Sequence, residues 1–109
     1  MSALALKKCV PCEGGVPPLT EAQAATLRAQ LNPDWTLTEG AKALKRSLKF
    51  KDFFRTMSFV NAVAHIANVE DHHPDLEIGY NYCRILYSTH SIGGLSENDF
   101  ICAAKIDRL

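Results

Sequence analysis

Two adjacent histidines followed by a proline are the residues of this sequence best suited to proton-transfer chemistry. His72 and His73 are two of only four histidines, and Pro74 follows them directly. Proline disfavours the helical conformation for the residue before it, so we expect His72 near the end of a helix and His73 just outside it. The carboxyl end of a helix carries partial negative charge, to which Glu70 and Asp71 add, and this favours a protonated ring. Desolvation of the second ring, or repulsion from the charge of the first, would keep the second ring neutral. The pair would then place an acid beside a base.

The histidine pair also has a plain structural interpretation. Asn61, His65, Asn68 and His72 recur at spacings of four, three and four, and so share one stripe of a helix. A polar stripe usually marks a solvated helix face, and we favour that interpretation for His65 taken alone. For His72 and His73 together, a capped helix end at the surface and a proton-transfer site both fit the pattern.

A third histidine and a carboxylate follow the pair. His90 ends the strand-like run "YSTH", sixteen residues after Pro74, and a hairpin of that length can return its tip to the histidine pair. Asp99 stands near the third position of the last predicted helix, where an anion is stabilised and where plain capping is the alternative. Three histidines and a carboxylate could also form a metal site of the three-histidine type. Adjacent ligands on one backbone are geometrically awkward, so we rank metal binding below acid–base chemistry.

Length and composition limit the classes of protein to consider. The 109 residues are 47% hydrophobic and 22% charged, which predicts one domain over 1–109 with an irregular lead-in over 1–18. Twelve basic residues balance twelve acidic ones, whereas nucleic-acid binders usually carry a basic excess. No apolar run approaches the roughly 20 residues of a membrane span, and "MSALALKK" lacks the order of a secretory signal. We therefore expect a soluble cytoplasmic protein that binds neither membranes nor nucleic acids.

The four cysteines do not form a familiar metal or redox pattern. Cys9 and Cys12 make a CxxC, but there is no second pair, and the histidine pair lacks zinc-finger spacing. A redox CxxC normally lies between a strand and a helix, whereas this one lies in the Gly- and Pro-rich stretch "CVPCEGGVPP". We interpret both as ordinary loop thiols. Cys83 and Cys102 fall in strand-like and helix-like runs, where a buried thiol is a small hydrophobic residue.

The periodicity of the sequence predicts an α+β domain. The expected order is a helix over 21–31, a short strand in 34–40, a strand over 43–51, a helix over 53–71, a strand region over 76–90 that can hold a second strand, and a helix over 97–109. This order favours helices packed on one face of an antiparallel sheet. An exposed edge strand would favour a dimer or tetramer.

Local signals indicate where the helices begin and which face of the long helix is buried. Thr20 with Gln23, and Ser96 with Asp99, have the spacing of capping boxes, and Asp52 can cap the long helix. Apolar residues of the long helix recur at spacings of three and four and predict one buried face, made of Phe53, Met57, Val60, Ala64 and Ala67.

Five motifs together resemble the pterin-4a-carbinolamine dehydratases. They are "SLKFKDF", "DHHPD", "GYN", "STH" and "GLSENDF", and the likeness extends from the "CVPCEGGVPPL" lead-in, typical of a bacterial-type branch, to "AAKID" near the carboxyl terminus. The spacing from the histidine pair through Tyr80 and His90 to Asp99 is the most specific part. The resemblance implies a four-stranded antiparallel sheet with helices packed on one face, assembled as a homodimer or homotetramer.

The resemblance also implies an activity and a set of site residues. The reaction is dehydration of 4a-hydroxytetrahydrobiopterin to the quinonoid dihydropterin, without metal or cofactor, downstream of an aromatic amino-acid hydroxylase. It requires a proton delivered to the departing hydroxyl and a proton removed from N5. The implied catalytic residues are His72, His73 and His90, of which His73 or His90 would accept the N5 proton. Substrate contacts are expected from Asn68, Asp71, Pro74 and Asp99.

Two positions depart from the family pattern. Members commonly carry an ionisable residue where this chain has Asn68, which would face His72 on a helix, so the substitution bears on the rate. Asn98 stands where animal proteins carry a basic residue, although "END" is frequent in the bacterial-type branch. Two alternative functions stay open. One is an interaction or dimerisation module, since animal relatives also bind a transcription factor. The other is pterin handling in a different pathway, such as molybdopterin metabolism.

Overall fold

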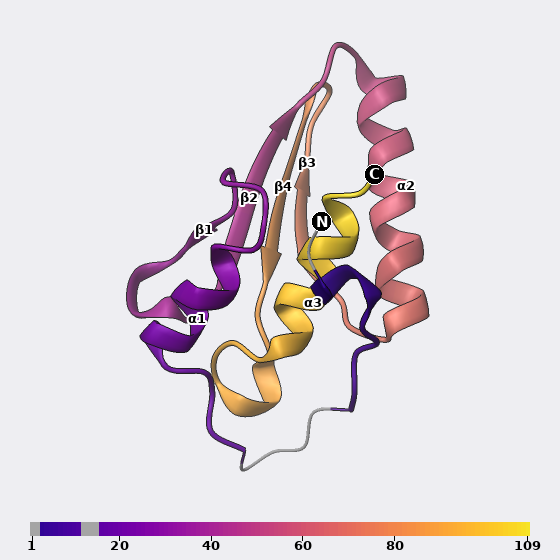
Figure 1. Ribbon diagram of the computed structural model, residues 1–109. Coiled ribbons are helices and arrows are strands. Elements are labelled where there is room, and N and C mark those ends of the chain that lie inside the picture. The colour runs from indigo at the N-terminus through magenta and orange to yellow at the C-terminus, as the bar shows by residue number, and fades with distance from the viewer. Residues whose placement is uncertain (1–2, 12–15) are drawn as a thin grey trace.

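The computed structural model describes residues 3–11 and 16–109, which form a sheet with helices beside it (Figure 1). The helices are η1 (Ala3–Leu6), α1 (Glu21–Arg28), η2 (Glu39–Ala41), α2 (Phe53–Glu70), η3 (His90–Ile92) and α3 (Glu97–Ile106), where η marks a 3-10 helix. The strands are β1 (Thr36–Leu37), β2 (Leu44–Lys49), β3 (Asp75–Ile78) and β4 (Tyr82–Tyr87). Within these residues no helix is both long and apolar enough to cross a membrane.

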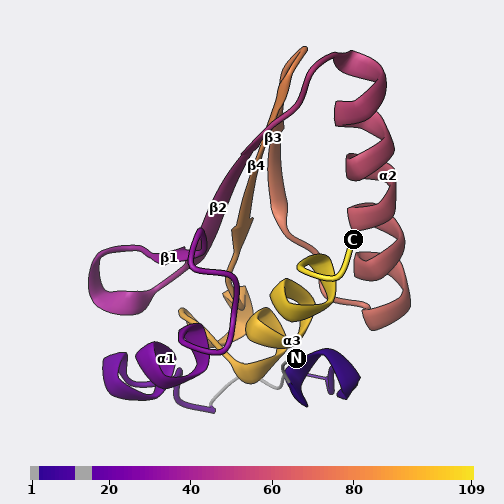
Figure 2. The same ribbon diagram turned by 45° about the horizontal axis from the view of Figure 1, so that its top comes forward.

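The four strands form one antiparallel sheet in the order β1-β2-β4-β3. Leu44 of β2 pairs with Tyr87 of β4, and Ile78 of β3 pairs with Cys83 of β4. Figures 1 and 2 show α2 and α3 on the same side of the sheet. The predicted α+β fold, a four-stranded antiparallel sheet with helices on one face, is confirmed.

The hydrophobic core lies between the sheet and the helices. Cys83, Ile85 and Tyr87 of β4 are buried while Arg84 is exposed, because successive side chains of a strand point to opposite faces. The largest fully buried side chains are Trp35, Tyr87 and Phe100. The predicted burial of Cys83 and Cys102 is confirmed, since the exposed fraction of each is 0%.

The capping signals fall where the sequence places them, although the first helix is shorter than predicted. The Thr20 backbone N–H donates to the Gln23 side chain at 2.9 Å, and the Gln23 N–H donates back to the Thr20 hydroxyl at 3.2 Å. This helix, α1, ends at Arg28, before the predicted stop at residue 31. At α3, the Ser96 N–H donates to the Asp99 carboxylate at 2.9 Å.

The long helix α2 begins where predicted, and the predicted burial of Val60 and Ala67 is confirmed, with Met57 partly buried against the core. Its buried residues are Thr56, Val60, Val63 and Ala67. The prediction was wrong at Phe53 and Ala64, which are exposed. The buried face includes Thr56, whose hydroxyl donates to the backbone carbonyl of Asp52 at 2.9 Å or of Tyr80 at 3.0 Å. A polar residue satisfied in this way can be buried, and an apolar pattern alone does not reveal it.

The strand-rich region 76–90 forms a hairpin. Its turn lies between β3 and β4, where the Gly79 N–H donates to the Tyr82 carbonyl at 3.0 Å. A Cβ atom at Gly79 would lie 2.1 Å from the Tyr82 ring, so a larger residue here would displace that ring. His90, predicted to end a strand, instead begins η3, because the chain leaves the sheet after Tyr87.

The N-terminal lead-in is more ordered than predicted. Its η1 turn buries Leu4 and Ala5, with exposed fractions of 2% and 7%. Lys105 of α3 donates from Nζ to the Ala5 carbonyl at 2.9 Å and so ties this turn to the last helix. Of the CxxC pair, Cys9 is half-buried and Cys12 lies outside the described residues.

Candidate active site

The carboxyl end of α2 sets the positions of the adjacent histidines. Asp71 adopts the left-handed backbone conformation (φ 52°, ψ 43°), which Asp tolerates better than most residues, and this ends the helix. The His72 N–H donates back to the Ala67 carbonyl at 3.1 Å, a bond typical of such helix ends. Both histidines therefore lie just beyond α2, and His73 continues into the connection to β3.

The His72 ring is bound to a buried carboxylate. His72 Nε2 lies 2.6 Å from Asp99 Oδ1, and the exposed fractions of the two side chains are 13% and 0%. The other oxygen, Oδ2, accepts hydrogen bonds from the Thr89 hydroxyl at 2.8 Å and from the Ser96 N–H at 2.9 Å. Asp99 was expected to contact substrate, but the structure places it behind His72, out of reach of solvent.

Charge and packing act on His72 in opposite directions. Burial lowers the pKa of His72, but the hydrogen bond and negative charge of Asp99, with smaller contributions from Cys102 and Asp71, outweigh burial and raise this pKa above its ordinary value. The ring stacks on Tyr87, with centroids 5.5 Å apart and planes 12° apart, and the Tyr87 hydroxyl donates to the His72 carbonyl at 3.3 Å. The ring is therefore held in place, and its protonated form is favoured.

An open cleft of about 620 Å³ brings three of the four histidines together. His72 is partly buried in its wall, whereas His73 and His90 are exposed. The β3–β4 hairpin produces this arrangement, because it returns the chain to the end of α2 before η3 begins (Figure 1). The residues that line the cleft are Cys9, Val10, Pro11, Val69, Glu70, Asp71, His72, His73, Ser88, Thr89, His90, Ser91 and Asn98.

The cleft includes only part of the expected substrate-contacting set. Asp71 lines it and is exposed. Asn68 lies exposed on α2, and Pro74 leads into β3; neither lines the cleft. His65 is exposed on α2 outside the cleft, in agreement with a solvated helix face.

The N-terminal segment forms one side of the cleft, which the sequence analysis did not predict. The Cys9 N–H donates to Glu70 Oε1 at 2.8 Å. The Asn98 side chain accepts from the Val10 N–H at 3.1 Å and donates to the Val10 carbonyl at 2.6 Å. Cys9, Val10 and Pro11 are thus attached to the ends of two helices, α2 and α3.

The thiol of Cys9 in this segment lies next to the buried thiol of Cys102 on α3. Cys9 Sγ is 3.6 Å from Cys102 Sγ, and the Cys102 thiol donates toward the His72 carbonyl at 4.0 Å. The hydrogen bond from Cys9 lowers the pKa of Cys102 against the effect of burial, and the same bond, together with burial, raises the pKa of Cys9. Cys9, Cys83 and Cys102 are unbridged thiols.

The side chains of the cleft suit proton transfer. A ring whose pKa is raised by a buried carboxylate can act as an acid, and an exposed imidazole can act as a base. Among the side chains of residues 3–11 and 16–109, no three of His, Cys, Asp or Glu are grouped so as to hold a metal ion.

Comparison with known proteins identifies the family. The family whose model matches residues 17–109 is described as pterin 4 alpha carbinolamine dehydratase. The chain belongs to this family. A protein of Nitrosomonas eutropha is 57% identical over 106 residues, which cover 97% of this chain and 92% of the relative. A protein of Legionella pneumophila is 55% identical over 108 residues, which cover 99% and 96%. Both relatives are provisionally named pterin-4-alpha-carbinolamine dehydratases.

Two solved structures share the fold. A crystal structure from Brucella melitensis, described as a transcriptional coactivator/pterin dehydratase, matches with a TM-score of 0.78 and 34% identity, covering 84% of this chain and 96% of the other. A pterin dehydratase-like protein described as a RuBisCO assembly factor in the alpha-carboxysome matches with a TM-score of 0.59 and 21% identity, covering 69% and 87%. The second likeness shows the fold alone. The family and fold inferred from the sequence motifs are therefore confirmed.

Proposed function

We propose that this protein dehydrates 4a-hydroxytetrahydrobiopterin, a pterin 4a-carbinolamine, to the quinonoid dihydropterin and water. The observation that supports this most is the cleft in which His72, paired with the buried Asp99, shares one space with His73 and His90. In a member of this family, that arrangement supplies both the acid and the base that the reaction requires.

The proposed reaction moves protons and needs no oxidant. The C4a–O bond breaks as a proton is delivered to the departing hydroxyl, which leaves as water. The proton on N5 passes to a base, and the electron pair that it leaves forms the C4a=N5 double bond. The mechanism uses no metal and no cofactor.

We assign the acid to His72 and the base to His73 or His90. Asp99 favours the protonated His72 ring and binds its Nε2, so the proton for the hydroxyl would leave from Nδ1. His73 and His90 are exposed at the same cleft, where an unprotonated imidazole can accept the N5 proton. We expect Asp71, whose exposed side chain also lines the cleft, to contact the substrate.

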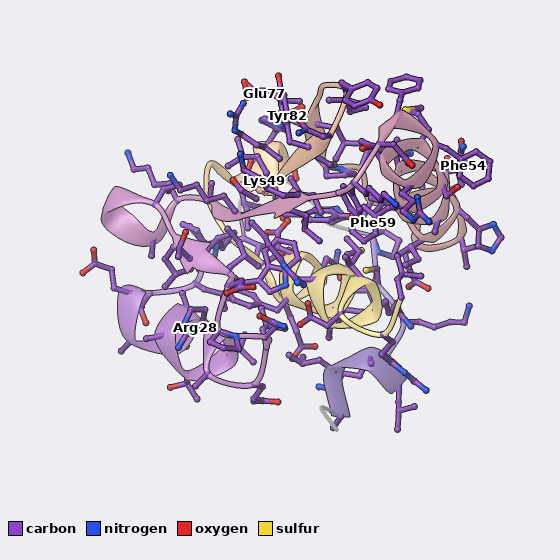
Figure 3. The ribbon with its side chains drawn as sticks, turned by 90° about the horizontal axis from the view of Figure 1, so that it is seen from above. Arg28, Lys49, Phe54, Phe59, Glu77 and Tyr82 are labelled. Carbon is purple, nitrogen blue, oxygen red and sulfur yellow. The ribbon has the colours of Figure 1, made fainter. Side chains whose placement is uncertain are left out.

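We further propose that the protein acts as a homodimer or homotetramer and that an aromatic amino-acid hydroxylase supplies its substrate. β3 is an edge strand of the sheet, and unpaired edges associate readily. Phe54 is 79% exposed and points away from the sheet, whereas Phe59 points toward it (Figure 3). A second copy covering Phe54 would bury this aromatic surface.

The decisive experiment is a stopped-flow assay with freshly generated carbinolamine in the presence of EDTA. Wild-type protein is expected to accelerate loss of the carbinolamine. His72→Ala, His73→Ala and His90→Ala are each expected to slow the catalysed rate, by about 100-fold for a residue that transfers a proton. His65→Ala, which removes the remaining histidine outside the cleft, is the matched control and should stay within about twofold of wild type.

Three other outcomes would contradict this proposal. Acceleration that disappears with EDTA would indicate a metal-dependent reaction. No acceleration over buffer would favour the alternative in which the chain is a non-catalytic pterin-binding or interaction module. Retained activity in all of the cleft variants would place the chemistry elsewhere in the protein.

A further inference from the structure

We propose that Asn98 is a positioning residue that holds Cys9, Val10 and Pro11 as an apolar wall of the cleft, and that this wall contacts the bound pterin. The inference rests on the proposed function and extends the binding site beyond the matched family region, which begins at residue 17. It concerns pterin affinity, and it leaves the proton transfers to the histidines.

The Asn98 side chain binds the backbone of Val10, and its backbone carbonyl accepts from the Cys9 thiol at 3.6 Å. Its amide accepts from the Val10 N–H at 3.1 Å and donates to the Val10 carbonyl at 2.6 Å, so both polar groups of that residue are bound. Asn98 itself is 4% exposed, which means that its amide is fixed within the protein. Asp99, the next residue on α3, holds His72. One turn of α3 therefore holds both His72 and the N-terminal segment, which line the same cleft.

A second, nearly buried side chain supports the same segment from α2. The Glu70 side chain is 5% exposed, and its Oε1 accepts from the Cys9 N–H at 2.8 Å. Its Oε2 lies 3.8 Å from Lys105 Nζ, and Lys105 also donates to the Ala5 carbonyl at 2.9 Å. The segment passes beside the end of α2 (Figure 1). A carboxylate removed from water in this way is costly unless it is bonded, so these contacts indicate a built attachment.

The wall presents apolar side chains to the cleft. Asn98 binds the backbone of Val10, and Val10 is 67% exposed where it lines the cleft. Pro11 and Val69 line the cleft beside it, and Val69 is 54% exposed. Small-molecule sites combine apolar walls with a few polar groups that fix orientation. A flat pterin ring placed against this wall would have its reacting edge toward the polar histidine side.

Variants of the wall are predicted to change KM, whereas variants of the histidines are predicted to change kcat. Contacts that act equally on the substrate and on the transition state change KM and leave kcat unchanged. Val10→Ala removes two carbon atoms from an exposed side chain, so the fold should be retained. It is expected to raise KM about threefold to tenfold, with kcat within about twofold of wild type. Asn98→Ala is expected to raise KM similarly, because it releases the segment.

The experiment combines turnover with two measurements that do not depend on it. KM and kcat are measured with the carbinolamine, and the Kd of 7,8-dihydrobiopterin, which has no 4a-hydroxyl to lose, is measured by equilibrium dialysis. Trypsin cleavage after Lys7 and Lys8 reports whether the segment is attached, and Asn98→Ala should accelerate it. Val16→Ala, also an exposed valine (55%) but outside the cleft lining, and Asn61→Ala, on the exposed face of α2, are the matched controls.

The outcomes distinguish this inference from the proposed function. A rise in KM and Kd for Val10→Ala, with both controls unchanged, supports contact between the wall and the bound pterin. This test does not depend on whether Asn98→Ala folds. Wild-type turnover with unchanged KM and Kd in Val10→Ala overturns the wall and leaves the proposed function standing. Faster trypsin cleavage of Asn98→Ala with unaltered Kd would likewise show a purely structural attachment. A wild-type protein that neither binds nor converts pterin would overturn both.

Discussion

His72 Nε2 lies 2.6 Å from Asp99 Oδ1, although 27 positions separate the two residues in the chain. The carboxylate is fully buried, and the ring is largely buried against Tyr87. A buried carboxylate next to an imidazole favours the imidazolium, and the pair then acts as one unit in which Asp99 both orients the ring and stabilises its charge. The consequences of this pairing can be measured without knowledge of the substrate.

Asp99→Asn is expected to lower the pKa of His72. In the wild type this pKa is raised above 6.5, so the folded state binds the His72 proton more tightly than the unfolded state does. The resulting stabilisation is complete below about pH 6.5 and is lost as the pH rises through the folded-state pKa. The wild-type free energy of unfolding should therefore decline across that interval, and the Asp99→Asn curve should be flatter. NMR titration of the His72 ring and urea denaturation between pH 6 and 9 test both statements.

The same substitution tests the assignment of the acid. If protonated His72 delivers the proton, activity is lost on the alkaline side when this ring deprotonates, and Asp99→Asn should move that limb to lower pH. His65→Ala, which changes an exposed histidine outside the cleft, should leave the profile in place. An unmoved alkaline limb in Asp99→Asn would assign the limb to another group.

The position of the histidine pair was predictable because its determinants are local. Pro74 restricts the residue before it, and Asp52 supplies a cap at the start of α2, so the sequence limits where that helix can lie. The hairpin between β3 and β4 follows from strand-rich residues interrupted by Gly79. These signals were sufficient to predict that His90 lies near the histidine pair.

The rest of the site depends on contacts that leave no periodic signal in the sequence. The bond between Val10 and Asn98 joins residues 88 positions apart, and Asn98 looks like an ordinary first-turn residue of α3. Asp99 satisfies a capping box, which gave no indication that its carboxylate would be buried under His72. The buried face of α2 was predicted only in part for a related reason: Thr56 is buried with its hydroxyl hydrogen-bonded, and apolar periodicity does not count such a residue.

Two substitutions of Asp71 should distinguish the effect of its charge on the pKa of His72 from the effect of its backbone conformation on stability. Asp71→Asn removes the charge but tolerates the left-handed conformation at φ 52°, so it should lower the pKa of His72 with a stability change within about 0.5 kcal/mol. Asp71→Ala removes the same charge and adds strain of about 1 kcal/mol to the end of α2. Urea denaturation and NMR titration of the two variants provide the comparison. Equal stability of the two would show that the left-handed position is not a constraint.

Thr89→Val should weaken the support of Asp99. The Thr89 hydroxyl is buried and donates to Asp99 Oδ2 at 2.8 Å, and valine has nearly the same shape without the donor. Removing a hydrogen bond from a buried carboxylate is expected to lower the free energy of unfolding by roughly 2 kcal/mol. Thr36→Val on β1, where the side chain is exposed, is the control and should change it by less than about 0.5 kcal/mol. If Thr89→Val lowers the free energy of unfolding as little as the control does, water must replace the lost hydroxyl donor.

Asp107 joins the end of α3 to β2 and to the connection between α1 and β1, away from the cleft, and its loss should affect stability more than catalysis. Its Oδ1 accepts from Trp35 Nε1 and from an Arg46 guanidinium nitrogen, each at 2.7 Å, and its Oδ2 accepts from the Asn32 N–H at 2.9 Å. The Arg46 and Asp107 side chains are only 14% and 16% exposed, so Asp107→Ala leaves a largely buried cation without its closest partner.

The expected cost of Asp107→Ala is roughly 3 kcal/mol, the magnitude typical of breaking a buried ion pair from one side. Asp34→Ala is the matched control, because Asp34 lies 3.9 Å from the same guanidinium but is 70% exposed, and it should cost less than about 1 kcal/mol. Urea denaturation followed by fluorescence of Trp35, the single tryptophan, measures both. Since Asp107 does not line the cleft, the kcat of correctly folded Asp107→Ala should stay within about twofold of wild type. A control as destabilised as Asp107→Ala would mean that Arg46 depends on the exposed partner as much as on the buried one.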